Sequence, residues 1–159
     1  MNMNRWRIVN LVLVASMAVA ATAAFAQSGE LGTWRLNAAK SKFTPGPAPK
    51  SSSVTFSAAG QGVKAVIDTV GADGSKVHWE YTANFDGKAY PVTGNPDGDM
   101  VVARRINPTS IETSYTLKGK ATTVNTRVVS ADGKTLTVTS TGTNAQGQKI
   151  NNVQVFDRG

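Results

Sequence analysis

The sequence contains no cysteine and only one histidine, and both shortages restrict the chemistry open to it. Without cysteine there can be no disulfide bonds, thiolate zinc sites, iron–sulfur clusters or cysteine nucleophiles. With one histidine, no metal site can use two imidazoles, and a histidine-dependent catalytic triad would have to use His78. We therefore predict no bound metal and no cofactor.

Acidic residues are also scarce, with 10 Asp and Glu against 17 Lys and Arg. The basic residues are scattered, and Arg104-Arg105 is their only adjacent pair. Nucleic-acid binding requires many phosphate contacts made together, so it favours clustered bases. The charge pattern predicts a mildly cationic, solvated surface and no nucleic-acid partner.

The N-terminus has the pattern of an export signal. Arg5 and Arg7 precede an apolar run, Leu11–Ala21, and the small-x-small sequence Ala24-Phe25-Ala26 follows. We expect residues 1–26 to be a signal peptide cleaved after Ala26, which would deliver the mature chain to the periplasm or outside of a bacterial cell. A membrane anchor is the alternative, but polar residues interrupt the apolar stretch, and we expect no stable membrane insertion after cleavage.

The chain after residue 26 has a composition typical of β-strands. It contains 14 valines and 17 threonines, but only 4 leucines and 3 glutamates. Side chains branched at Cβ pack well on a pleated surface and lose rotamer freedom in helices. Apolar residues also alternate along several segments, as Val77, Trp79, Tyr81 and Ala83 do.

Glycine-containing turns divide this chain into short segments. Asp-Gly pairs at Asp73, Asp86 and Asp132 suit tight hairpins because glycine tolerates positive φ. The expected strands are Gly32–Asn37, Ser52–Ala58, Val63–Gly71, Lys76–Asn84, Lys88–Thr93, Met100–Asn107, Ser110–Lys118, Ala121–Ser130, Thr135–Asn144 and Lys149–Asp157.

The short connections leave no room for crossover helices, so neighbouring strands must pair as antiparallel hairpins. We predict a single all-β domain over residues 27–159, an up-and-down meander of about eight to ten strands closed into a barrel. Closure removes the two exposed sheet edges. A two-sheet sandwich is the alternative.

The segment from Ala38 to Ser51 interrupts the meander with prolines at every second position from Pro45 to Pro49. Each proline fixes φ and disfavours helix at the preceding residue, so we expect an extended, stiff loop. Phe43 is its one large apolar side chain. It could plug the opening of a barrel, or it could anchor a plain connector at the surface.

Two clusters of polar residues are candidates for chemistry. His78 and Glu80 would share one strand face, which allows an acid–base pair, although a solvent-facing polar pair is the alternative. Asn95, Asp97 and Asp99 alternate as in a calcium loop. Calcium loops need a glycine and a bidentate glutamate that this segment lacks, so a polar hairpin loop is favoured.

The candidate ligand-binding residues are the large aromatic side chains and one arginine. The aromatic residues could line a pocket or simply fill the core. Arg127 lies among valines, and its side chain could face the solvent or point inward, where a guanidinium requires an anion or an aromatic face. The full candidate set is Trp34, Phe43, Trp79, Tyr81, Tyr115 and Arg127.

Gly32-Thr33-Trp34 near the start of the expected first strand resembles the G-x-W signature of the lipocalins. In that family the tryptophan closes one end of the barrel and packs against an arginine, a role open here to Arg158 or Arg127. The strand number is similar to that of the intracellular lipid-binding barrels of the same wider group, but no helical lid is legible. Segments 32–51 and 86–94 also resemble small exported bacterial proteins of unknown function.

These features predict a small exported binding module that holds a small apolar or amphipathic molecule in its interior. The alternative is an envelope protein that captures or inhibits a protein partner through the proline-rich loop and strand edges, with a filled barrel. An enzyme dependent on His78 or Glu80 is a third possibility. The sequence identifies neither the ligand nor a protein partner.

Overall fold

The computed structural model describes residues 29–159, and the predicted signal peptide therefore lies outside the described residues. The described chain forms ten β-strands and one 3-10 turn. Their bounds are β1 (Gly32–Leu36), η1 (Ala38–Lys40), β2 (Ser51–Ala59), β3 (Gly62–Val70), β4 (Lys76–Asn84), β5 (Asp86–Thr93), β6 (Met100–Asn107), β7 (Ser110–Leu117), β8 (Lys120–Val129), β9 (Thr135–Thr143) and β10 (Lys149–Arg158). Every predicted strand is present, and the bounds differ from the prediction by two residues at most.

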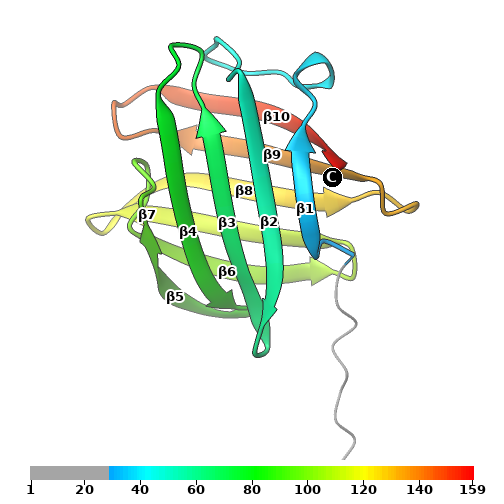
Figure 1. Cartoon of the computed structure of the whole chain (residues 1–159). Coiled ribbons are helices and arrows are strands. Elements are labelled where there is room, and N and C mark those ends of the chain that lie inside the picture. Colours follow the sequence, from blue (N-terminus) through cyan, green and yellow to red (C-terminus); the bar gives the residue numbers. More distant parts are fainter. Residues whose placement is uncertain (1–28) are drawn as a thin grey trace, which may run out of the picture.

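The strands close into one antiparallel barrel, as predicted. Each strand pairs with its neighbours in the sequence, and β10 returns to pair with β1. β1 to β4 lie in front of β5 to β10 and cross them at a steep angle (Figure 1), so the barrel is flattened into two layers. The layers remain one continuous sheet, because β4 still pairs with β5 at Glu80–Thr93 and Tyr81–Val92.

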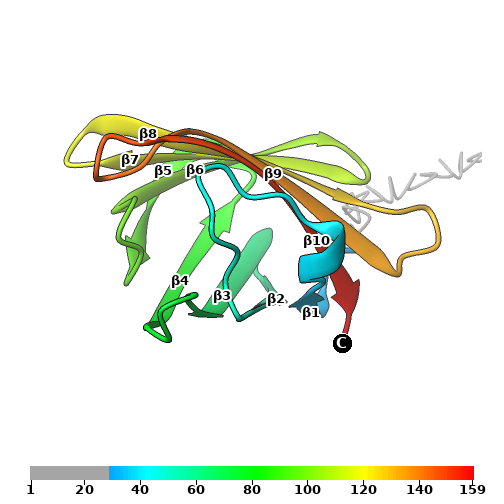
Figure 2. The ribbon, with the colours of Figure 1, turned by 90° about the horizontal axis from the view of Figure 1, so that it is seen from above.

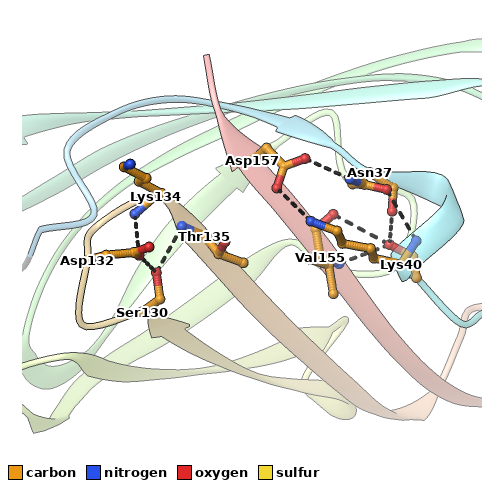
Figure 3. Close-up of polar contacts among 9 residues, drawn as sticks. Asn37, Lys40, Ser130, Asp132, Lys134, Thr135, Val155 and Asp157 are labelled. Atoms are coloured by element: carbon orange, nitrogen blue, oxygen red, sulfur yellow. Dashed lines mark hydrogen bonds and ion pairs between the residues drawn. The ribbon is translucent and has the colours of Figure 1, made fainter.

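The Asp-Gly turns adopt the geometry that the sequence predicts. Gly74, Gly87 and Gly133 have φ values of 89°, 74° and 69°, a region that favours glycine. In the β8–β9 turn, Asp132 accepts hydrogen bonds from the Ser130 hydroxyl at 2.6 Å and the Lys134 backbone N–H at 3.0 Å (Figure 3). The aspartate side chain thus supports the turn that its glycine neighbour allows.

The core is formed by alternate residues of the strands. Trp34, Phe156, Ile111 and Leu136 are among its largest fully buried side chains. On β4, Tyr81 and Ala83 are buried and Val77 and Trp79 half-buried, as the alternation predicts.

The proline-rich segment differs from the prediction at its beginning. It opens with the 3-10 turn η1, where the Asn37 side chain accepts a hydrogen bond from the Lys40 backbone N–H. Asn37 also donates to the Asp157 carboxylate at 2.7 Å, and Lys40 lies 3.7 Å from the same carboxylate (Figure 3). The local capping bond and these contacts to β10 outweigh the extended tendency expected for the segment.

The rest of this segment covers an edge of the barrel. β1 pairs with β10 only over the last three residues of β10, from Phe156 to Arg158. Beyond them, Lys42 bridges Val153, and Thr44 accepts a hydrogen bond from the Asn151 N–H. Figure 2 shows the segment following β10 and then crossing to β2 in the other layer. Its backbone thereby satisfies hydrogen-bonding groups that an open strand edge would expose.

Within residues 29–159, no helix is long and apolar enough to cross a membrane.

Candidate functional site

A cavity of about 200 Å³ lies inside the barrel between the two layers. Its apolar wall comes from β2, β3, β9 and β10, and its polar groups come mainly from β4, β7 and β8. The lining residues are Ser52, Val54, Phe56, Ile67, Thr69, Trp79, Tyr81, Tyr115, Asn125, Arg127, Val138, Gln154 and Phe156. The interior is therefore partly hollow, which favours the predicted binding module over the alternative of an envelope protein with a filled barrel.

A second cavity of about 260 Å³ adjoins the first. The two share five lining residues, Thr69, Trp79, Tyr115, Asn125 and Gln154. The second cavity extends to the β5–β6 connection, which contributes Asn95, Pro96 and Asp97, and its lining is more polar. Together they reach the size range of small-molecule pockets.

Three aromatic rings gather between the two cavities. Trp79 stacks on Tyr81 with ring centroids 6.1 Å apart. Both rings form edge-to-face pairs with Tyr115, with centroid separations of 5.9 Å for Trp79 and 6.3 Å for Tyr81. These separations are typical of stabilising aromatic pairs. The strand alternation of β4 and β7 places all three side chains on the inner face, so this part of the predicted candidate set is brought together.

Arg127 points inward, and the residue is 5% exposed. Its Nη1 donates a hydrogen bond of 2.6 Å to the Tyr81 hydroxyl, and its Nη2 lies 3.2 Å from Oε2 of Glu30. The guanidinium also lies over the Phe56 ring, at 4.6 Å from the centroid. The inward alternative for Arg127 is therefore correct, and Glu30 is the anion that such burial requires.

Burial and mutual charge shift the pKa values of this cluster. Burial, followed by the neighbouring Tyr81, raises the pKa of the Tyr115 hydroxyl well above its usual value. Burial alone would lower the pKa of Arg127, but Tyr81 and Glu30 outweigh it and raise the pKa. Arg127 is thus a fixed positive charge, and Tyr115 is a neutral hydroxyl at physiological pH.

Two polar side chains of β8, Arg127 and Asn125, line the first cavity. Nη2 of Arg127 faces Oε2 of Glu30 in the ion pair, whereas Nε of Arg127 and Oδ1 of Asn125 have no hydrogen-bond partner among the described residues. Buried polar groups are rarely left unpaired, because each one costs the free energy of its lost hydration. β8 thus brings a guanidinium, which donates hydrogen bonds, and an amide, which also accepts them, to the cavity lining.

Trp34 lies apart from both cavities. The Arg158 guanidinium stacks on its ring at 4.2 Å from the centroid, and the indole N–H donates to the Glu30 carbonyl at 2.7 Å. Arg158 also donates to the carbonyls of Gly29 and Leu31. Of the two arginines that the resemblance left open as the partner of Trp34, Arg158 is the one that packs on its ring. Its hydrogen bonds also hold the residues on either side of Glu30.

The remaining predicted candidates lie elsewhere. Phe43 is half-buried in the segment beside β10 and lines neither cavity. His78 and Glu80 are on the outer face, where they pair separately, His78 with Asp68 at 2.7 Å and Glu80 with Lys64 at 3.0 Å. They therefore do not form an acid–base pair with each other.

The Asn95–Asp99 segment is a polar loop between β5 and β6, as the sequence predicts. Asp97 accepts a hydrogen bond from the Ala145 N–H at 2.8 Å, and Asp99 accepts one from the Lys118 N–H at 2.8 Å. Across residues 29–159, no group of three or more His, Cys, Asp or Glu side chains is arranged to hold a metal ion. Asp97 and Asp99 instead link this loop by hydrogen bonds to the turns at Ala145 and Lys118.

Of the cavity lining, the predicted set contains only Trp79, Tyr81, Tyr115 and Arg127. Two of the polar residues of the site that it leaves out are Glu30 and Asn125. Glu30 precedes the first strand, and nothing in its surroundings in the sequence marks it as buried. Asn125 shares a strand face with Arg127, so an inward assignment of Arg127 would have found it.

No protein-family model and no curated protein matches the sequence. Among solved structures, the chain is similar to the zebrafish ileal bile acid-binding protein complexed with cholic acid. The alignment covers 83% of this chain and 100% of that chain, with 12% sequence identity and a TM-score of 0.48. At that identity, a likeness of fold does not imply a shared ligand.

Proposed function

We propose that this protein binds a small, partly apolar molecule inside the barrel. The observation that supports the proposal most directly is the 200 Å³ cavity, which combines apolar walls with the buried guanidinium of Arg127. Asn125 adds an amide to the same lining. A cavity with a few polar groups in an apolar lining has the usual features of a small-molecule site.

The apolar part of the ligand would contact one side of this cavity. Val54, Ile67, Val138 and Phe156 supply that side from four strands. Burying apolar surface there contributes about 25 cal/mol per Å² removed from water, which drives entry of the ligand. Its polar part would lie against the Arg127 guanidinium and the Asn125 amide, which both line the cavity.

Binding can be tested with 1-aminoanthracene, an uncharged fluorophore with a compact apolar body. Its emission is expected to rise and shift to the blue on titration with the protein, because the dye leaves water for the cavity. Val138→Phe replaces an isopropyl side chain of the cavity wall with a larger aromatic ring. We expect the variant to bind the dye at least about tenfold more weakly, which is about 1.4 kcal/mol.

Val124→Phe is the matched control, because Val124 is 38% exposed and lies on the outer face of β8. It should leave dye binding unchanged. Absence of binding to the unmodified protein, or equal binding by the Val138→Phe variant, would contradict the proposal.

We also propose that the protein acts after export. The proposal is supported by the basic, apolar and small-residue order of the first 26 residues. Expression of the full chain in a bacterial host should yield a periplasmic or secreted protein whose N-terminal residue is Gln27. A product that retains Met1 and stays in the cytoplasm would contradict it.

A further inference from the structure

We infer that the cavity selects uncharged ligands and rejects carboxylates, even though its main polar group is an arginine. The inference rests on the proposed function and specifies the chemical class of the ligand. It follows from the charge balance between Arg127 and Glu30, from the hydrogen bonds that hold the chain around Glu30, and from the polar side chains of the cavity lining. These polar side chains also suit a ligand that can donate a hydrogen bond.

The positive charge in the cavity is already neutralised. Arg127 and Glu30 are 5% and 2% exposed, and Nη2 of Arg127 lies 3.2 Å from Oε2 of Glu30. Among the described residues that line the two cavities, Arg127 is the only cation, and Asp97 adds a negative charge to the second cavity. No positive charge in this lining therefore remains for an anionic ligand.

A ligand carboxylate at Arg127 would place a second anion beside the buried carboxylate of Glu30. Like charges repel strongly at low dielectric, and a carboxylate that leaves water without its own counter-charge loses hydration free energy. A carbonyl or hydroxyl can accept the same N–H groups without adding charge. The unfavourable electrostatic free energy therefore applies to a ligand with a carboxylate and not to an uncharged ligand.

The ligand cannot easily displace Glu30, because the chain around it is fastened. The Glu30 carbonyl accepts a hydrogen bond of 2.7 Å from the Trp34 indole. The carbonyls of its two neighbours, Gly29 and Leu31, accept hydrogen bonds from Arg158. Glu30 therefore acts as a built-in counter-ion.

The polar side chains of the lining also suit a head group that both donates and accepts hydrogen bonds. The Arg127 guanidinium only donates hydrogen bonds, whereas the Asn125 amide also accepts them, and both side chains line the first cavity. A primary amide or a hydroxyl supplies both, but an ionised carboxylate has no donor. At about 30 Å³ for each group the size of a water molecule, the two adjoining cavities of about 200 and 260 Å³ hold roughly fifteen such groups. An amphiphile the size of octanamide, with about ten non-hydrogen atoms, is thus of suitable size.

Octanamide and octanoate provide a direct test, since they have the same shape and differ in charge at pH 7.5. Calorimetric titration of the mature protein should show octanamide binding at least about tenfold more tightly, given the cost of placing like charges side by side. Equal or tighter binding of octanoate would overturn the inference and leave the proposed function standing. If neither compound nor 1-aminoanthracene binds, the proposed function fails and the inference fails with it.

Glu30→Gln removes the built-in counter-ion and should lower the ratio of octanamide to octanoate affinity by at least about tenfold. Because this variant leaves Arg127 unpaired and is less stable, the rise in its melting temperature with each compound is measured as well. Octanoate should stabilise it more than octanamide does. Glu80→Gln, on the outer face, is the matched control and should keep the unmodified preference. An unchanged ratio in a folded Glu30→Gln variant would overturn the inference.

Discussion

Replacing Arg127 with methionine should destabilise the barrel severely, because the change leaves the Glu30 carboxylate buried without a counter-charge. Glu30 is 2% exposed, and its Oε2 lies 3.2 Å from Nη2 of Arg127. Removal of one partner from a buried ion pair costs about 3–5 kcal/mol. The variant also loses the 2.6 Å hydrogen bond to Tyr81. We expect a loss of about 4 kcal/mol, a large part of the 5–15 kcal/mol that stabilises a typical domain.

Urea unfolding, followed by tryptophan fluorescence, measures this loss. With a denaturant slope of about 2 kcal/mol per molar urea, the midpoint should fall by about 2 M. The double variant Glu30→Met/Arg127→Met leaves no buried charge, and it should be more stable than the Arg127→Met variant, since apolar replacement of a whole buried pair is often close to neutral.

Lys64→Met is the control on the outer face. It breaks the 3.0 Å pair between Lys64 and Glu80, whose side chains are 43% and 39% exposed. Exposed pairs contribute about 0–1 kcal/mol, so the midpoint should barely move. A loss below about 1 kcal/mol for Arg127→Met would refute the reasoning about the buried pair. The reasoning would also be refuted if the double variant lost as much free energy of unfolding as Glu30→Met and Arg127→Met lose together.

Three further predictions concern the frame of the barrel. Arg158→Ala removes the guanidinium over the Trp34 ring and its hydrogen bonds to the N-terminal carbonyls, and thermal unfolding should show a loss of about 2 kcal/mol. Gly62→Ala would place a Cβ 2.0 Å from the Ala83 carbonyl oxygen, so the strands must separate, and the melting temperature should fall by an amount equivalent to about 1–3 kcal/mol. The Ser130 side chain and then the Lys134 backbone lower the pKa of Asp132, so its ionised form stabilises the folded state above the usual aspartate pKa of about 3.9. The difference in melting temperature between the unmodified protein and Asp132→Asn should be present at pH 6 and disappear as the pH falls to 2, and a constant difference would contradict this.

The local features of the barrel were predictable because they depend on neighbouring residues. Alternation along β4 placed Trp79 and Tyr81 on one face, and the Asp-Gly pairs marked turns that need positive φ. The partner of Trp34 was predictable only through a family resemblance. Nothing in the local sequence brings Arg158 to Trp34, since the contact exists only after β10 returns to β1.

The direction of β8 shows where local reasoning ends. Its two faces are similarly mixed, with Asn125 and Arg127 on one and Val124 and Val128 on the other. Apolar burial alone would turn the valines inward, yet Val124 and Val128 are 38% and 41% exposed and Arg127 is buried.

By itself, the sequence determined that the chain forms antiparallel hairpins and where they turn, because branched side chains, alternation and turn residues act over a few positions. The choice between a barrel and a sandwich was settled by the pairing of β10 with β1, which are distant in the sequence. Only the tertiary structure decided that Arg127 faces inward and that a cavity remains beside it. Glu30, Phe56 and Tyr81 compensate the buried charge from three distant parts of the chain. The free energy of that burial depends on partners that meet only when the barrel is closed.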